Sequence, residues 1–125
     1  RWPANALVLG IMIGDQEKAF PFEVVRELGL LEDEVNSIPI LLVYNPALNT
    51  VSVFDRRLGG QTLDFEKGSE DSTLVDLQTQ SSWSISSGEA IAGELLGQKL
   101  RNLNVPLVFW FAWSDIHPNT ALFSE

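Results

Sequence analysis

The sequence contains no cysteine and only one histidine in 125 residues. Without cysteine the chain has no disulfide framework, no thiol nucleophile and no thiolate ligand for a metal. The single histidine, His117, excludes a His–His metal pair and a relay of histidine with cysteine. The lack of cysteine is compatible with either redox compartment, so it leaves the cellular location open.

Long hydrophobic runs and basic residues are also scarce. The longest apolar runs, residues 38–43 and 105–113, are far shorter than the roughly 20 residues that a membrane-spanning helix needs. Eight basic residues stand against 17 acidic ones, which gives a net charge of −9. An acidic surface repels phosphate, so nucleic acid is not expected as a partner and a protein with a basic face is. A salt-rich habitat is the alternative explanation of the acidity.

Length and composition predict one folded domain over residues 1–125. Hydrophobic residues make up 45% of the chain and charged residues 20%, as in ordinary globular proteins. No internal repeat, low-complexity tract or shift of composition marks a second domain. The chain opens on Arg1-Trp2-Pro3 without a leader pattern. We therefore expect membrane association only through a partner, or through a leader or anchor that precedes Arg1.

The hydrophobic pattern predicts a mainly β (α+β) domain, compact and antiparallel, with about two short helices. Residues 6–13 form a buried-strand candidate that turns at Gly14-Asp15 and returns over residues 18–20. Alternating apolar residues predict a β-hairpin over residues 50–66, with its turn at residues 58–61. Four further segments are expected to contain short strands or strands with turns: residues 39–44, 73–77, 89–100 and 120–123. A helix over residues 89–96 is the alternative for the third of them.

Two segments have helical spacing. Phe22, Val25 and Leu28 follow Pro21 at intervals of three, and Gly29 is placed to end that helix. Residues 107–116 predict a second helix, which ends before Pro118. The acidic segment of residues 30–37 is expected to be a loop.

Four polar residues near the centre of the sequence are candidate binding groups. Asn45 and Asn49 flank a Pro turn, where they would either bind a ligand or serve as turn formers. Asp55 and Arg56 end a predicted strand. Arg56 offers a bidentate fork for a carboxylate or phosphate, and the alternative is a salt bridge at the strand end.

The tryptophans and the histidine are the remaining candidates. Trp83, Trp110 and Trp113 would line a cleft or pack in the core with the indole N–H satisfied. His117 would act as a general base near Asp115 or interact with the end of the preceding helix. No serine-hydrolase motif or calcium-loop spacing occurs, so we expect no catalytic residue, no metal and no cofactor.

Several short motifs resemble, in order and spacing, a family of uncharacterised bacterial and archaeal proteins, DUF3179. Any one of them is weakly specific, whereas their order over the whole chain is specific. The matching residues are Val8-Leu9-Gly10, Lys18-Ala19-Phe20-Pro21, Tyr44, Pro46, Thr50, Phe54-Asp55-Arg56, Thr62-Leu63-Asp64-Phe65, Ser82-Trp83-Ser84, residues 88–93, residues 97–100, Trp110, Trp113, His117, Pro118 and Thr120.

The resemblance implies two cysteines at the positions of Asn45 and Leu48 and a histidine at that of Leu28. Thiolate and imidazole together would suit a metal or redox site. Asn and Leu cannot supply either group, so we do not expect this chain to carry such chemistry.

Our first hypothesis is therefore a non-catalytic accessory or structural subunit. It is expected to be extracytoplasmic, periplasmic or at the cell surface, as the family resemblance implies. It would dock onto a larger membrane-embedded or electron-transfer complex, with residues 1–6 and 30–37 as contacts. The alternative is a small-molecule or metal-binding protein, or an enzyme, with a rebuilt site near Asn45, Arg56 and His117; Asn49 and Trp83 would complete that site.

Overall fold

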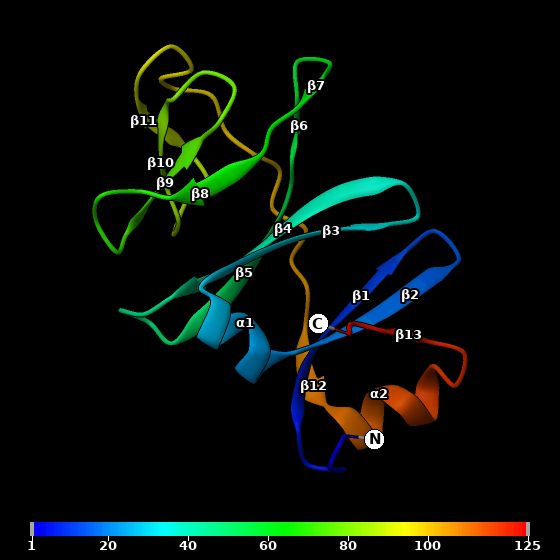
Figure 1. Cartoon of the computed structure of the whole chain (residues 1–125). Helices are drawn as coiled ribbons and strands as arrows, with labels where there is room; N and C mark the ends of the chain where they lie inside the picture. The colour runs from blue at the N-terminus through cyan, green and yellow to red at the C-terminus, as the bar shows by residue number, and fades with distance from the viewer. Residues whose placement is uncertain (1, 125) are drawn as a thin grey trace.

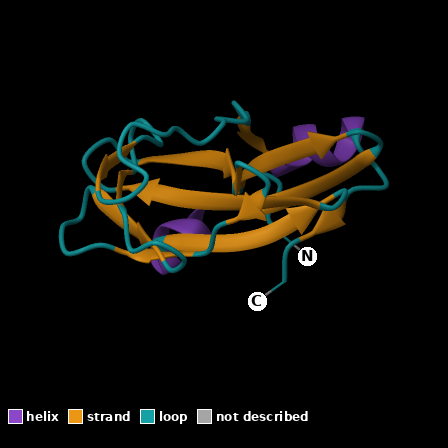
Figure 2. Ribbon diagram, turned by 90° about the horizontal axis from the view of Figure 1, so that it is seen from above, coloured by secondary structure: helices purple, strands orange, loops and turns teal. Residues whose placement is uncertain are grey.

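The computed structural model describes residues 2–124 and is built mainly from strands (Figure 1). Three sheets and one short hairpin carry most of the chain, together with the helices α1 (Phe22–Leu28) and α2 (Trp110–Ile116). Seen from above, the two helices lie on opposite sides of the strands (Figure 2). The predicted mainly β class with two short helices is confirmed.

The first sheet contains the N-terminal hairpin and the C-terminal strands. Its order is β12-β1-β2-β13, and its strands are β1 (Leu7–Ile13), β2 (Gln16–Pro21), β12 (Leu107–Phe109) and β13 (Ala121–Leu122). The pairing is antiparallel except between β13 and β2, which are parallel.

The second sheet, β3-β4-β5, lies in the middle of the molecule. It consists of β3 (Leu30–Val35), β4 (Ile38–Asn45) and β5 (Thr50–Asp55). The third sheet has the order β11-β10-β9-β8, from β8 (Phe65–Lys67), β9 (Thr73–Asp76), β10 (Ser82–Ser84) and β11 (Ala90–Ala92). The separate hairpin pairs β6 (Arg57–Leu58) with β7 (Gln61–Thr62).

Alternation along β4 explains its uninterrupted apolar sequence. Ile40 and Leu42 point to a core that the first sheet and α1 share, and Leu41 and Val43 point to a core shared with the third sheet. A strand that is covered on both faces is apolar at every position. The layers are therefore the first sheet with α1, the second sheet and the third sheet, with α2 on the outer face of the first.

Two predicted elements are wrong, and a third begins later than predicted. Residues 30–35 form strand β3 instead of a loop, because pairing with β4 gives their backbone groups partners while Glu32 and Asp33 are satisfied by Phe65 N–H and Lys18. The predicted hairpin of residues 50–66 does not form, since β5 pairs with β4 and the turn at Gly59-Gly60 closes only β6 and β7. The predicted second helix begins at Trp110, after β12 has paired with β1.

Segment 100–106 connects the layers and is called the crossing segment below. In Figure 1 it runs down the middle of the molecule from β11 to β12. Asp55 N–H donates to Arg101 O at 2.9 Å, and Leu103 N–H to Val53 O at 2.9 Å. Gly10 N–H then donates to Pro106 O at 3.2 Å. One extended stretch therefore borders the second sheet and then the first.

Gly10 provides the space on β1 that α2 needs. A Cβ at this position would overlap the indole of Trp113, and the indole N–H donates to Thr120 Oγ1 at 2.9 Å. The glycine therefore lets α2 lie directly on the sheet.

We expect Gly10→Ala to lower the free energy of unfolding by about 1–3 kcal/mol, because the added methyl overpacks this contact. Trp113→Phe removes the benzo ring that the methyl meets, so the double variant should lose less than the sum of the single losses. Urea unfolding of the four proteins measures this coupling. Additive losses would show that the Gly10–Trp113 contact is not the cause.

Candidate functional site

Asn45 and Asn49 shape the turn between β4 and β5. Asn45 is buried, and its Oδ1 accepts hydrogen bonds from Ala47 N–H at 3.1 Å and Leu48 N–H at 3.4 Å. Asn49 has a φ of 54°, a left-handed conformation that asparagine tolerates, and its Oδ1 accepts from the Tyr44 hydroxyl at 2.7 Å. Both side chains are engaged in holding the turn.

Asp55 and Arg56 do not pair with each other. Adjacent residues of an extended chain point to opposite sides, whereas residues two apart share a side. Asp55 accordingly pairs with Arg57, accepting from Nε at 3.0 Å, from a terminal nitrogen at 2.7 Å and from the backbone N–H at 2.9 Å. These hydrogen bonds from Arg57 hold the pKa of Asp55 below its ordinary value, against the opposing effect of burial.

Arg56 points inward and links the second sheet to the chain that leads into the third. Its guanidinium donates to Ile40 O at 2.9 Å, to Leu63 O at 3.2 Å and to Asp64 Oδ1 at 3.0 Å. The residue is only 9% exposed, so this fork is occupied by the protein itself.

Trp83 is a core residue. It is 1% exposed and its indole N–H donates to Asp76 Oδ2 at 2.8 Å. Burial raises the pKa of the fully buried Asp76, but the hydrogen bonds from Trp83, Thr79 and Ser81 outweigh it and leave that pKa below its ordinary value.

His117 lies at the end of α2, where its backbone N–H donates to Trp113 O at 2.8 Å. Its ring stacks on the Trp113 indole at a centroid distance of 3.9 Å, and its Nδ1 pairs with Glu17 Oε2 of β2. Glu17, not Asp115, is therefore the carboxylate beside it.

The predicted site residues do not gather in one place. Asn45 lies opposite Thr50 at one end of β5 and Asp55 lies at the other. Because β5 is 6 residues long, these ends are roughly 17 Å apart. Of the six candidates, Asp55 and His117 share a cavity, while Trp83 is sealed in the core on the far side of the second sheet. Within residues 2–124 no three His, Asp or Glu side chains gather as potential metal ligands.

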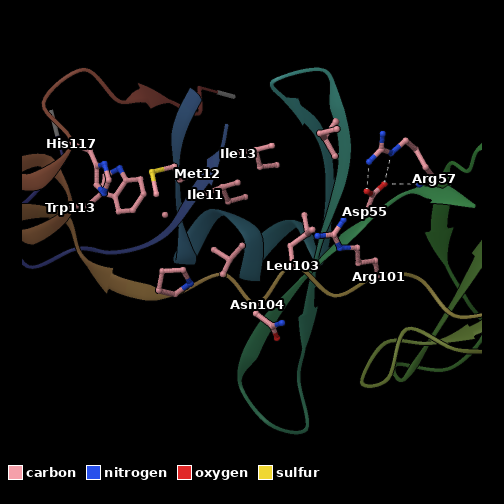
Figure 3. A pocket seen from close by; sticks show the side chains of 14 residues that line it. Ile11, Met12, Ile13, Asp55, Arg57, Arg101, Leu103, Asn104, Trp113 and His117 are labelled. Carbon is pink, nitrogen blue, oxygen red and sulfur yellow. Dashed lines mark hydrogen bonds and ion pairs between the residues drawn. The ribbon is translucent and has the colours of Figure 1, made fainter. Parts of the chain in front are cut away.

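The cavity that holds Asp55 and His117 is a groove of about 570 Å³ between β1 and the crossing segment (Figure 3). Trp113 and His117 lie at one end and Asp55, Arg57 and Arg101 at the other. The stretch between them is mostly apolar. It is lined by Gly10, Ile11, Met12, Ile13, Ile38, Leu103, Asn104, Val105 and Pro106.

Sequence reasoning missed Arg57 and Arg101 as groove residues. Arg101 lies in a polar stretch with no motif around it, so only its hydrogen-bonded place beside β5 reveals it. Trp113, anticipated as a cleft residue, does line the groove, whereas Trp110 stacks edge-on against Trp2.

Next to the groove, the outer strand β12 carries exposed apolar side chains. Leu7 lies opposite Phe109 in the register, and the Phe109 and Phe111 rings stack at a centroid distance of 5.9 Å. Leu7, Leu107, Phe109 and Phe111 are between 39% and 56% exposed and are called the apolar edge below.

The family model described as "Protein of unknown function (DUF3179)" matches residues 1–125. The chain belongs to the DUF3179 family. No curated protein and no solved structure matches it significantly. No helix among the described residues is long and apolar enough to cross a membrane.

In this DUF3179 protein, the positions for which the resemblance implies two cysteines and a histidine lie in the β4–β5 turn and at the end of α1. Tyr44 N–H donates to Gly29 O at 2.8 Å, which places the residues next to Leu28 and Asn45 in direct contact. Leu28 and Leu48 are exposed there, and Asn45 closes the turn. A turn and two leucines thus stand where the resemblance implies soft ligands.

We expect Arg56→Lys to lower the free energy of unfolding by about 2–4 kcal/mol, because one ammonium cannot satisfy the groups that the fork reaches. Arg26→Lys is the matched control. Within residues 2–124 the exposed Arg26 forms an ion pair with exposed Glu23 alone, so the free energy of unfolding of this variant should change by less than about 0.5 kcal/mol. Chemical denaturation of both variants provides the test. Equal losses would mean that the buried fork contributes no more than a surface pair.

A pH titration tests the Asp76 contacts. An acid whose folded pKa is lowered adds stability above its unfolded pKa of about 3.9, and this stability is lost as the pH falls through the folded pKa. Asp76→Asn should therefore cost about 1–3 kcal/mol at pH 7, and its difference from the wild type should shrink below about pH 4. The exposed Asp71→Asn is the control. A difference that stays constant down to pH 2 would contradict the assignment.

Proposed function

We propose that this DUF3179 protein is a non-catalytic accessory subunit that docks onto a larger protein complex. The observation that carries the proposal is the apolar edge. An outer strand with exposed Leu107 and Phe109, flanked by Leu7 and Phe111, is the kind of surface that proteins cover with a partner.

The charge of the chain supports a partner with a basic face. A net charge of −9 attracts basic surfaces at long range and speeds their encounter, while the apolar edge supplies contact area once they meet. The family resemblance favours an extracytoplasmic place for this complex, at a membrane-embedded or electron-transfer assembly. Two segments were expected from the sequence to contact the partner. Residues 2–6 of the first lead into the apolar edge, and Arg1 lies outside the described residues. Residues 30–35 of the second form strand β3.

The alternative of a rebuilt site near Asn45, Arg56 and His117 has less support. The Asn45 side chain accepts hydrogen bonds that hold a turn, and the Arg56 guanidinium donates to groups within the protein. His117 lines the groove, which neither of them lines.

The test is purification of the full-length product from its native cells, followed by crosslinking. The wild type should be recovered with a partner at fixed stoichiometry, and higher salt should weaken the complex. Phe109→Ser should reduce partner recovery at least about tenfold, since buried aromatic anchors dominate interfaces. Leu48→Ser, which changes an even more exposed apolar side chain at the β4–β5 turn, should leave recovery unchanged.

A free monomer without any crosslinked partner would overturn docking. Equal recovery with Phe109→Ser and Leu48→Ser would overturn the role of the apolar edge. Fractionation of the same cells tests the location, and recovery in the cytosol alone would contradict the extracytoplasmic assignment.

A further inference from the structure

We propose that the groove between β1 and the crossing segment binds a small amphipathic monocarboxylate, with its carboxylate at Arg101 and its apolar tail directed toward Trp113. This ligand site lies outside the apolar edge and goes beyond the docking function proposed above.

One end of the groove carries three charged residues, of which Asp55 and Arg57 are paired with each other and Arg101 is not. Asp55 and Arg57 form a two-pronged ion pair at 2.7 and 3.0 Å, and the Arg57 backbone N–H also donates to this carboxylate. The two side chains therefore neutralise each other. Arg101 is exposed, and among residues 2–124 no carboxylate lies within ion-pair distance of its guanidinium. Among the described residues, this end of the groove thus holds one cation, Arg101, that forms no ion pair, although its charge helps to lower the pKa of Asp55.

A free guanidinium at the end of an apolar groove selects the charge of the ligand. Its fork matches a carboxylate, with which it forms two parallel hydrogen bonds. A cationic ligand would be repelled, and a neutral one would leave the fork unpaired. The Asp55 carboxylate next to it and the overall charge of −9 disfavour ligands with several negative charges. One negative charge fits best.

The middle of the groove determines the kind of tail. Ile13, Leu103 and Val105 are partly exposed and present hydrocarbon, Ile11 is buried in the core beside them, and the indole of Trp113 lies at the far end. A volume of about 570 Å³ falls in the range of cavities that hold small organic molecules. A sugar or a peptide backbone would lose hydrogen bonds to water here without replacement, whereas an alkyl or aryl tail loses none.

Titration calorimetry with decanoate, decanol and decylamine tests the proposal, with tryptophan fluorescence as a second readout for Trp113. Decanoate should bind at least about tenfold more tightly than decanol, since hydrogen bonds to a charged group are among the strong ones. Decylamine should bind more weakly than decanol. Naphthoate compares an aryl tail with the alkyl one.

Arg101→Gln should remove the preference for decanoate over decanol while leaving the circular dichroism spectrum unchanged. Arg26→Gln, on the outer face of α1, is the matched control and should keep it. Leu103→Ser should weaken decanoate and decanol alike. Phe109→Ser changes only the apolar edge, so it should keep decanoate binding even where it abolishes docking, which separates a failure of this proposal from a failure of the first.

Equal affinity for decanoate and decanol in the wild type would overturn the proposal, as would an unchanged preference in Arg101→Gln. If neither decanoate nor naphthoate binds at about 1 mM, the proposal is also overturned. A dissociation constant above about 1 mM corresponds to a binding free energy weaker than about −4 kcal/mol, which is too weak for a specific site. A peptide with a free C-terminal carboxylate that binds more tightly than decanoate would reassign the groove to a protein ligand.

Discussion

The structure depends on the backbone hydrogen bonds of the crossing segment. Leu100 N–H donates to Gly88 O beside the third sheet, Leu103 N–H to Val53 O on the second, and Pro106 O accepts from Gly10 on the first. Each sheet alone leaves backbone groups without partners at its edge, and this segment supplies partners to two of them in turn. The crossing segment thereby links the sheets, most of whose paired strands are consecutive in sequence.

The groove is a consequence of that path. After Leu103 the chain leaves β5, and it joins β1 only at Pro106, so the last residues of β1 face a hollow instead of another strand. Arg101 enters the hollow from the point where the crossing segment borders Asp55. The same geometry that joins the sheets therefore places at the end of an apolar surface a guanidinium that has no ion-pair partner among residues 2–124.

Two charged residues inside the protein are bonded to the scaffold. Arg56 and Asp76 are buried, and each is satisfied by several hydrogen bonds within the chain. A buried charge is tolerated only under that condition. The residues that remain free to meet another molecule lie at the surface, on the apolar edge and in the groove, which is why both proposals concern binding.

The sequence by itself determined the elements whose signals are local. The alternation and turn residues predicted β1 and β2, and the spacing of Phe22 and Val25 with Gly29 predicted α1, because these patterns reflect contacts between near neighbours. The resemblance to DUF3179 also followed from the order of motifs alone.

Only the tertiary structure decided that residues 30–35 form β3 and that β5 pairs with β4 instead of with residues 61–66, since the apolar faces of these strands are buried against residues far along the chain. It also decided the partners of the candidate residues. Arg56 bonds to carbonyls that lie 7 and 16 positions away, and His117 meets Glu17 across 100 positions. Arg101 showed no signal in the sequence, because its place in the groove comes from where the crossing segment lies and from the pairing of Asp55 with Arg57, which leaves Arg101 without an ion pair among residues 2–124.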